Sequence, residues 1–382
     1  MAFGKRNHVS LNPLSYNICL LGESKIGKTT VIKEFCEKLT NDVEGGYLFA
    51  EIGQERGADA IEGINYVNCP TWDMDYDEDT NSVGFGDLIE DIIENKTSDY
   101  KNLKVLVWDT YDQLINIAEQ KSIDLYNRIT PDKKVSSINA AWGGYGRGEK
   151  KAIDIMLDTI ARLRQVGVAT IVIGHVKTKD NSDVMTGETF QTLTSDQQNN
   201  YFNALKKNMH IIGTAYIDRS IVKEKTGKKD TKTGKEILKG KIVSESRKIK
   251  LRDDTYCVDC GGRFADITNE INLDASEFIQ AINDAILAEQ SKSSQSLEEA
   301  KKIEVAKEKK LEEKVAENEK NTKENEELER NKSTIMVYCK ANKNNPEALK
   351  SIIELCRNHG YANPSMITDL ETSKEALELI KG

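Results

Sequence analysis

The residues best suited to chemistry lie near the start of the chain, in the stretch "GESKIGKT". Its glycines, lysine and threonine fit the G-x-x-x-x-G-K-[ST] pattern of a phosphate-binding loop, which is specific when a buried strand precedes it and a helix follows. An apolar run over residues 16–22 comes before it, and a helical pattern begins at Lys28. The sequence therefore predicts an ATP-binding loop made of Gly22, Glu23, Ser24, Lys25, Ile26, Gly27, Lys28, Thr29 and Thr30.

Each part of this loop has a physical task. Gly22 and Gly27 allow a tight turn whose backbone N–H groups point inward, and the helix after them presents its positive end to phosphate. Lys28 adds a positive charge near the β- and γ-phosphates, which makes it a candidate catalytic residue. The hydroxyl of Thr29 is the kind of oxygen ligand that Mg²⁺ needs. We therefore expect ATP and Mg²⁺ as the cofactors.

A carboxylate on a neighbouring strand is expected to complete the magnesium site. In "KVLVWDTYDQL", a run of apolar residues ends at Asp109. An aspartate at this place orders the water shell of the metal, so we predict that Thr29 and Asp109 bind magnesium. The alternative is an ordinary aspartate that starts a turn at the end of a strand.

Hydrolysis also needs groups that act on the attacking water and on the γ-phosphate. The stretch "YLFAEIGQERG" offers Glu51 at the end of a strand and Glu55 shortly after it. We favour Glu51 as the group that orients water, although either residue could be a plain surface carboxylate. His175 ends the apolar run "TIVIGH". We expect it beside Asp109, where it would sense the state of the nucleotide; a structural histidine is the alternative.

Buried strands alternate with helices through the first part of the chain. The apolar runs are typical of strands that are covered on both faces, and the alternation favours a mainly parallel sheet with helices on both sides. We predict strands over residues 16–22, 46–52, 104–109, 169–175 and 210–218, and a helix over residues 149–165. Residues 177–198 lack a core pattern and are predicted as a long loop, and residues 219–264 as antiparallel structure with a Lys-rich turn.

The composition changes towards the end of the chain. Residues 291–332 are mostly Lys, Glu, Ala and Asn and keep no heptad pattern, which favours a solvated or partly disordered helical linker over a coiled coil. The predicted organisation is an α/β fold in four parts: an N-terminal extension over residues 1–14, an ATPase core over residues 15–275, a charged helical linker over residues 276–332, and a small all-α domain over residues 333–382.

Bulk properties predict a cytoplasmic protein. The 382 residues carry a net charge of −9 and include seven scattered cysteines, which fits a reducing compartment better than a disulfide framework. We see no apolar run of bilayer length and no signal-peptide pattern, so no membrane contact is expected. Cys257 and Cys260 form a C-x-x-C pair without a second pair nearby, which is too little for a structural zinc site.

The order of "GESKIGKT", "LFAEIGQERG", "KVLVWDTYDQL", "YGRGEKK", "VIGHVK" and "YCVDCGGRF" resembles one family, the phage-encoded RecA-like P-loop ATPases of the Sak4 type, which are relatives of RecA and RadA. The resemblance covers roughly residues 15–267. It implies a RecA-like core that acts on single-stranded DNA in phage recombination or replication, by annealing or strand exchange, in the host cytoplasm. It also implies a ring or filament of identical subunits with ATP held between them.

In such assemblies a cation from one subunit completes the ATP site of the next. We name Arg263 as the candidate catalytic cation, although the sequence does not distinguish it from its neighbours, and a plain charge at a sheet edge is equally consistent. The candidate cations are Arg247, Lys248, Lys250, Arg252 and Arg263.

A local basic stretch supports contact with DNA. Residues 223–250 hold eleven basic and four acidic side chains, and Phe190 in the predicted loop is available for base stacking. The alternative is a Lys-rich hairpin that only aids solubility. Two rival functions remain, an ATP-dependent helicase loader or a protein-assembly regulator, neither with direct DNA activity. We expect the C-terminal domain to bind a replication or recombination partner.

Overall fold

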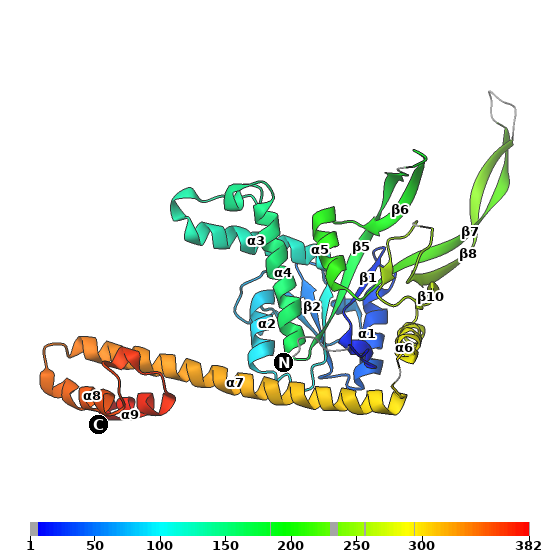
Figure 1. The fold of residues 1–382 in the computed structure, drawn as a ribbon. Helices are drawn as coiled ribbons and strands as arrows, with labels where there is room; N and C mark the ends of the chain where they lie inside the picture. Colours follow the sequence, from blue (N-terminus) through cyan, green and yellow to red (C-terminus); the bar gives the residue numbers. More distant parts are fainter. Residues whose placement is uncertain (1–6, 184, 230–235, 256, 294, 382) are drawn as a thin grey trace.

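The computed structural model describes residues 7–381 except 184, 230–235, 256 and 294. One large sheet lies between two layers of helices, and a long helix crosses beneath it (Figure 1). The strands are β1 (Ile18–Gly22), β2 (Tyr47–Ile52), β3 (Tyr66–Cys69), β4 (Val105–Asp109), β5 (Ala169–Ser182), β6 (Thr189–Ser195), β7 (Ile211–Lys229), β8 (Glu236–Lys250), β9 (Gly261–Gly262) and β10 (Glu270–Asn272). The helices are α1 (Lys28–Thr40), α2 (Phe85–Glu94), α3 (Tyr111–Ile129), α4 (Arg147–Gln165), α5 (Asn199–Asn208), α6 (Ala275–Ser291), α7 (Leu297–Ala341), α8 (Pro346–Asn358) and α9 (Leu370–Lys381).

The strand order places the phosphate-loop strand near the centre of the sheet. The order is β10-β8-β7-β1-β5-β4-β2-β3, and the strands from β7 to β3 along this order are parallel. Strands β8 and β10 run antiparallel at one edge. Strand β5 therefore separates β1, which leads to the phosphate loop, from β4, which ends at Asp109. This arrangement confirms the predicted α/β fold with a mainly parallel sheet and an antiparallel hairpin.

Both faces of the sheet are buried, as the apolar runs predicted. Alternate residues of each central strand point to opposite faces, because successive side chains of a strand alternate in direction. On β4, Leu106 and Trp108 pack with α2, α3, α4 and α5, whereas Val105 and Val107 pack with α1 and α6. Helix α6 lies in the stretch predicted as linker, yet Phe278 and its apolar neighbours are part of this second core cluster.

The prediction of a long loop over residues 177–198 is wrong. Strand β5 continues past His175 to Ser182 and pairs with β6 in an antiparallel hairpin. Most side chains of this hairpin beyond Lys177 are at least partly exposed, so it shows no alternation of apolar and polar residues. The predicted antiparallel structure after residue 218 is confirmed as the hairpin β7–β8. Residues 230–235, which belong to the predicted Lys-rich turn, lie outside the described residues.

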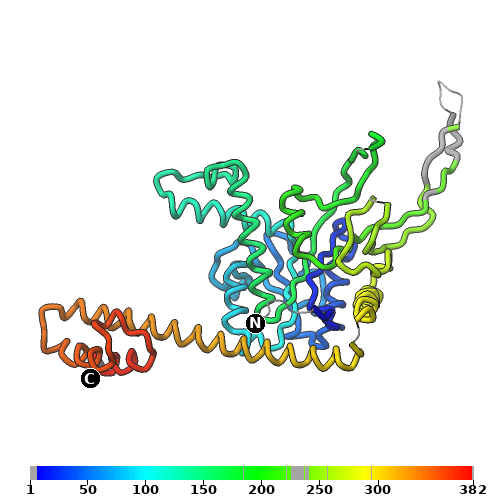
Figure 2. The backbone as a smooth tube through the Cα atoms, in the orientation of Figure 1, coloured from blue at the N-terminus to red at the C-terminus, as the bar shows by residue number. Residues whose placement is uncertain are grey.

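Helix α7 spans 45 residues, beginning at a capping box formed by Ser296 and Glu299. Figure 2 shows it running along the side of the core opposite the two hairpins, with α8 and α9 clustered at its far end. Buried Ile335 of α7 packs there with Ile352 and Ala376. The charged stretch is therefore helical. None of the helices in the described part of the chain combines the length and apolarity that crossing a bilayer requires.

Candidate nucleotide-binding site

The phosphate loop joins the end of β1 to the start of α1, as the sequence predicts. Gly27 immediately precedes α1 at a φ of 109°, a left-handed conformation that favours glycine. Gly22 is required for a different reason. A Cβ atom at Gly22 would lie 2.9 Å from the Cβ and the carbonyl oxygen of Ala215, so a side chain there would force β1 and β7 apart.

Lys28 is the first residue of α1, and its side chain turns back to the phosphate loop. Its Nζ donates to the carbonyl oxygens of Gly22 at 3.0 Å and Glu23 at 2.9 Å. Burial lowers the pKa of Lys28, and the carboxylate of Asp109 opposes that shift. The ammonium group is thus held at the loop by backbone oxygens, in a place where it can pair with a phosphate.

Thr29 and Asp109 meet although β5 separates β4, which ends at Asp109, from β1, which leads to the phosphate loop. The Thr29 hydroxyl donates to Asp109 Oδ2 at 2.8 Å. Asp109 is 9% exposed, and burial raises its pKa to about 6, with the Thr29 hydrogen bond acting in the opposite direction. A hydroxyl and a carboxylate oxygen beside the phosphate loop are donors that suit Mg²⁺, so these residues fit the metal that the sequence implied.

Glu51 lies on the next strand, at the same level of the sheet as Asp109. The side chain is 4% exposed, and its Oε1 accepts the backbone N–H of Ala58 at 2.8 Å. Its Oε2 is buried without a hydrogen-bond partner in the described structure. Burial raises the pKa of Glu51. Glu55 is half-buried in the segment after β2, and its charge acts on Lys28, Asp109 and His175. Both candidate carboxylates therefore belong to this edge of the sheet.

His175 sits level with Gly22 in the sheet, at the point where β5 leaves the parallel core. Its Nδ1 is 2.7 Å from Oδ2 of Asp112, on the first turn of α3. Sequence reasoning missed Asp112. An acidic residue in the first turn of a helix is favourable by itself, so nothing marked this one as part of the site.

The predicted cations separate into three groups. Arg247 Nη1 donates to the Ile26 carbonyl oxygen at 3.0 Å, so this arginine contacts the phosphate loop of its own chain. Arg263 lies at the other end of the strands, where its backbone N–H donates to His210 and its guanidinium to Lys207. The remaining cations form ion pairs within the chain: Lys248 with Asp218 and Glu270, Lys250 with Glu270, and Arg252 with Asp254.

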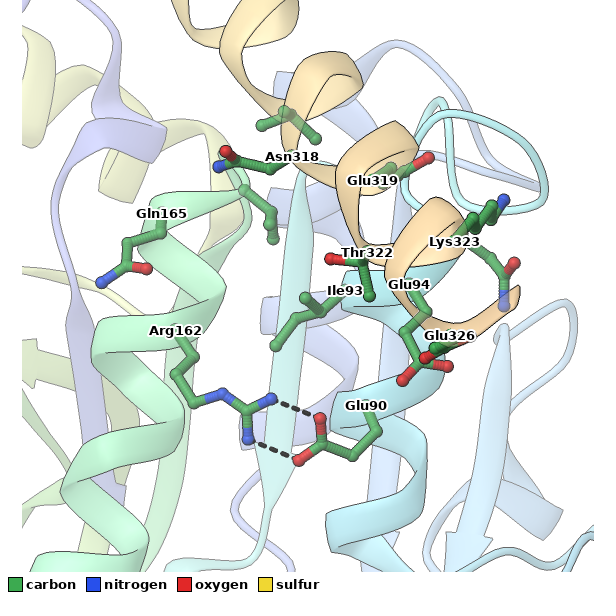
Figure 3. Close-up of a pocket in the computed structure, with 13 residues that line it drawn as sticks. Glu90, Ile93, Glu94, Arg162, Gln165, Asn318, Glu319, Thr322, Lys323 and Glu326 are labelled. Carbon is green, nitrogen blue, oxygen red and sulfur yellow. Dashed lines mark hydrogen bonds and ion pairs between the residues drawn. The ribbon is translucent and has the colours of Figure 1, made fainter. Parts of the chain in front are cut away.

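A cavity of about 460 Å³ lies between α2, α4 and α7, and none of the phosphate-loop residues lines it (Figure 3). Most of the residues that line it are polar or charged, and Arg162 forms a two-pronged ion pair with Glu90 on one wall. Cys257 and Cys260 precede β9 as free thiols, and within the described ranges no cluster of three or more His, Cys, Asp or Glu residues is arranged to hold a metal.

Comparison with known proteins agrees with this geometry. The family described as "AAA domain" matches residues 14–241, more than half of the chain, so the chain belongs to that family. It is a nucleotide-binding P-loop ATPase with a RecA-like core, a class that typically uses Mg²⁺.

Among solved structures, a KaiC-like protein from the hyperthermophilic archaeon Pyrococcus horikoshii has 12% identity and a TM-score of 0.30, over 63% of this chain and 79% of that one. No curated protein has a significant match to the sequence.

Proposed function

We propose that this chain is a phage-type RecA-like ATPase that binds single-stranded DNA in the host cytoplasm, in recombination or replication, by annealing or strand exchange. One observation carries the proposal. The basic hairpin β7–β8 is joined to the phosphate loop through Arg247, whose Nη1 lies 3.0 Å from the Ile26 oxygen. A change at the loop on binding ATP would therefore act on the root of the hairpin.

The charge of the hairpin supports DNA as its ligand. Eleven basic against four acidic residues between 223 and 250 stand out on a chain with a net charge of −9. Lys223 and Lys241 are exposed on the described part of the arm, although Lys241 also pairs with Glu224 at 2.9 Å. The neighbouring hairpin β5–β6 carries Phe190, which is 36% exposed and can stack on a base.

Within the ATP site we assign Glu51 to orient the attacking water and His175 to sense the γ-phosphate. We further propose that the chain assembles into a ring or filament in which Arg263 completes the ATP site of a neighbouring subunit. Its place at the N-terminal ends of the strands supports this, because the phosphate loop of the same chain lies at their C-terminal ends. The helices α8 and α9 would bind a replication or recombination protein.

ATP hydrolysis with and without a single-stranded oligonucleotide tests the main proposal. We expect DNA to stimulate hydrolysis by wild-type protein and Lys28→Ala to abolish it. Replacing Lys223 and Lys241 together with alanine should weaken DNA binding and lower its dependence on salt, whereas the matched pair Lys309→Ala and Lys310→Ala, exposed on α7, should not. Hydrolysis that DNA does not stimulate, together with no DNA binding at low salt, would refute the proposed action on DNA.

Two other results would favour one of the alternative functions over action on DNA. Stimulation by a replicative helicase but not by DNA would favour the helicase-loader alternative. DNA-independent assembly with slow hydrolysis would favour a protein-assembly regulator.

A mixing experiment tests the role of Arg263 in a neighbouring subunit. Mixing inactive Lys28→Ala and Arg263→Ala subunits should restore part of the activity, because some sites then pair an intact loop with an intact arginine. A mixture that stays inactive would exclude Arg263 from that role.

A further inference from the structure

His175 is held on one side by a buried carboxylate. Oδ2 of Asp112 lies 2.7 Å from Nδ1 of the His175 ring and accepts the backbone N–H of the same residue at 2.9 Å. Its other oxygen, Oδ1, accepts Nε2 of Gln197 at 3.0 Å. Asp112 is only 8% exposed, so both oxygens are committed to partners inside the protein. The contact with Asp112 therefore holds the His175 ring in place through its Nδ1 atom.

This network joins three elements at the edge of the sheet that carries the phosphate loop. Asp112 is on the first turn of α3, His175 is in β5, and Gln197 lies between β6 and α5. The two ends of the hairpin β5–β6 also meet directly, because the backbone N–H of Asp196 donates to the His175 oxygen at 3.2 Å. Since α3 begins directly after Asp109 and Thr110, Asp112 links the predicted metal ligand to the root of the hairpin.

The proton on His175 determines what the other ring nitrogen can do. With Nδ1–H directed at Asp112, a neutral ring leaves Nε2 without a proton, whereas an imidazolium carries an N–H at Nε2 that can donate to a phosphate oxygen. The hydrogen bond with Asp112 raises the pKa of His175, against the opposing effects of burial and of Lys28. Asp112 thus favours the form of the ring that can act as a donor.

Charged groups from several neighbouring elements interact electrostatically with this ring. They are Lys28 on α1, Glu55 after β2, Asp109 on β4, Asp112 on α3 and Asp196 after β6. Burial raises the pKa of Asp196 to about 6, and its contact with Asp112 adds to that rise. Asp112 itself keeps a lowered pKa despite its burial, because the His175 ring and the neighbouring polar side chains stabilise its charge. Asp112 is therefore the charge that dominates the environment of the ring.

We propose that Asp112 is a positioning residue that fixes the His175 ring through Nδ1 and ties it to the base of the hairpin β5–β6, so that a phosphate contact at His175 changes the hairpin. The inference rests on the proposed role of His175 at the γ-phosphate. It adds the residue that prepares His175 for that contact and the element that receives the signal.

The first test follows the imidazole nitrogens by NMR in the nucleotide-free protein. The chain has four histidines, so the His175 signal can be assigned by its loss in His175→Gln. In Asp112→Asn we expect His175 to titrate about one pH unit or more below its wild-type value, because the neighbouring negative charge is gone. His210, whose pKa is lowered to about 4 by burial, should not move. A His175 titration that is unchanged in Asp112→Asn would overturn the positioning role.

The second test measures the hairpin and the reaction. A non-hydrolysable ATP analogue should slow hydrogen exchange over residues 176–195 in wild-type protein, and Asp112→Asn and His175→Gln should both lose most of that protection. We expect Asp112→Asn to lower kcat more than it raises the KM for ATP, Asp112→Glu to recover part of the loss, and Asp158→Asn, exposed on α4, to behave like wild type.

The outcomes separate this inference from the proposed function. A shifted His175 titration with unaltered hydrolysis and unaltered hairpin exchange would overturn both the signal to the hairpin and the proposed role of His175. An unaltered titration with normal DNA-stimulated hydrolysis would overturn the role of Asp112 and leave the proposed function intact. If Asp112→Asn does not fold, His175→Gln still tests the hairpin, since it leaves Asp112 and Gln197 in place.

Discussion

Replacing Glu51 with glutamine removes one charge from the ATP site while keeping the size of the side chain. In the wild-type protein Oε1 accepts the Ala58 N–H at 2.8 Å, and the oxygen of a glutamine amide can accept the same bond. Oε2 has no partner in the described structure, so it is the atom free to accept a proton from an attacking water. A group positioned in this way contributes about 10²- to 10⁴-fold to the rate, so we expect kcat to fall by about that factor.

The same substitution should not weaken the fold. Burial raises the pKa of Glu51, so the charged form opposes folding. The sign follows from linkage: the stability associated with a raised carboxyl pKa is complete below the pKa of the unfolded chain and is lost as pH rises through the folded pKa. Glu51→Gln should therefore be as stable as wild type in acid and at least as stable at about pH 8, with ATP affinity within a few-fold.

Single-turnover hydrolysis, titration with a fluorescent ATP analogue, and urea unfolding at two pH values measure these effects separately. Glu55→Gln is the matched control, because Glu55 lies at the same edge and also influences Asp109. Hydrolysis by Glu51→Gln within a few-fold of wild type would refute the reasoning. If Glu55→Gln then showed the large loss, the water-orienting role would belong to Glu55.

Three further predictions follow from single contacts. Burial raises the pKa of Asp109 from 3.8 to about 6, so Asp109→Asn should stabilise the nucleotide-free protein by up to about 3 kcal/mol near pH 8 and by little near pH 4; an equal gain at both pH values in urea unfolding would contradict this. Arg247→Met removes the bond to the Ile26 oxygen and should weaken binding of a fluorescent ATP analogue by about tenfold, whereas Arg252→Met should not. Glu319 on α7 accepts both the backbone N–H and the hydroxyl of Thr97, so Glu319→Ala should cost about 1–3 kcal/mol and speed hydrogen exchange in α7, and exposed Glu313→Ala provides the control; equal exchange in both variants would show that this contact does not hold the helix.

The parts of the site that the sequence predicted are local or lie at the ends of apolar strands. The phosphate loop is a contiguous pattern, and Asp109 and Glu51 each follow a run of apolar residues. Parallel strands bring such ends to one edge, so their proximity could be expected before the order of the strands was known. The insertion of β5 between β1 and β4 is a non-local property, and no spacing in the chain encodes it.

The features that the sequence did not predict also have physical explanations. The hairpin β5–β6 projects beyond the helical layers and buries little, so it lacks the alternation that identifies a half-buried strand. Helix α6 did carry a signal, because Phe278, Ile282 and Ile286 repeat at helical spacing, but the charged stretch that follows obscured it. Arg247 and Asp112 act through a backbone oxygen and a neighbouring ring, and such partners are visible only once the strands are placed.

The two hairpins lie on one side of the core and helix α7 lies on the opposite side (Figure 2). Each hairpin places a side chain at the nucleotide site, Arg247 for β7–β8 and His175 for β5–β6, and both hairpins project from the edge where ATP would bind (Figure 1). Helix α7 instead contacts Thr97 and Gly167, in the segments that precede β4 and β5. A ligand held by the hairpins would therefore sense the nucleotide directly, whereas a partner on α8 and α9 would be joined to the core by helix α7, whose contacts with Thr97 and Gly167 lie outside the ATP site. Coupling between such a partner and hydrolysis would have to pass through the core strands, and Glu319→Ala weakens one of the contacts on that route.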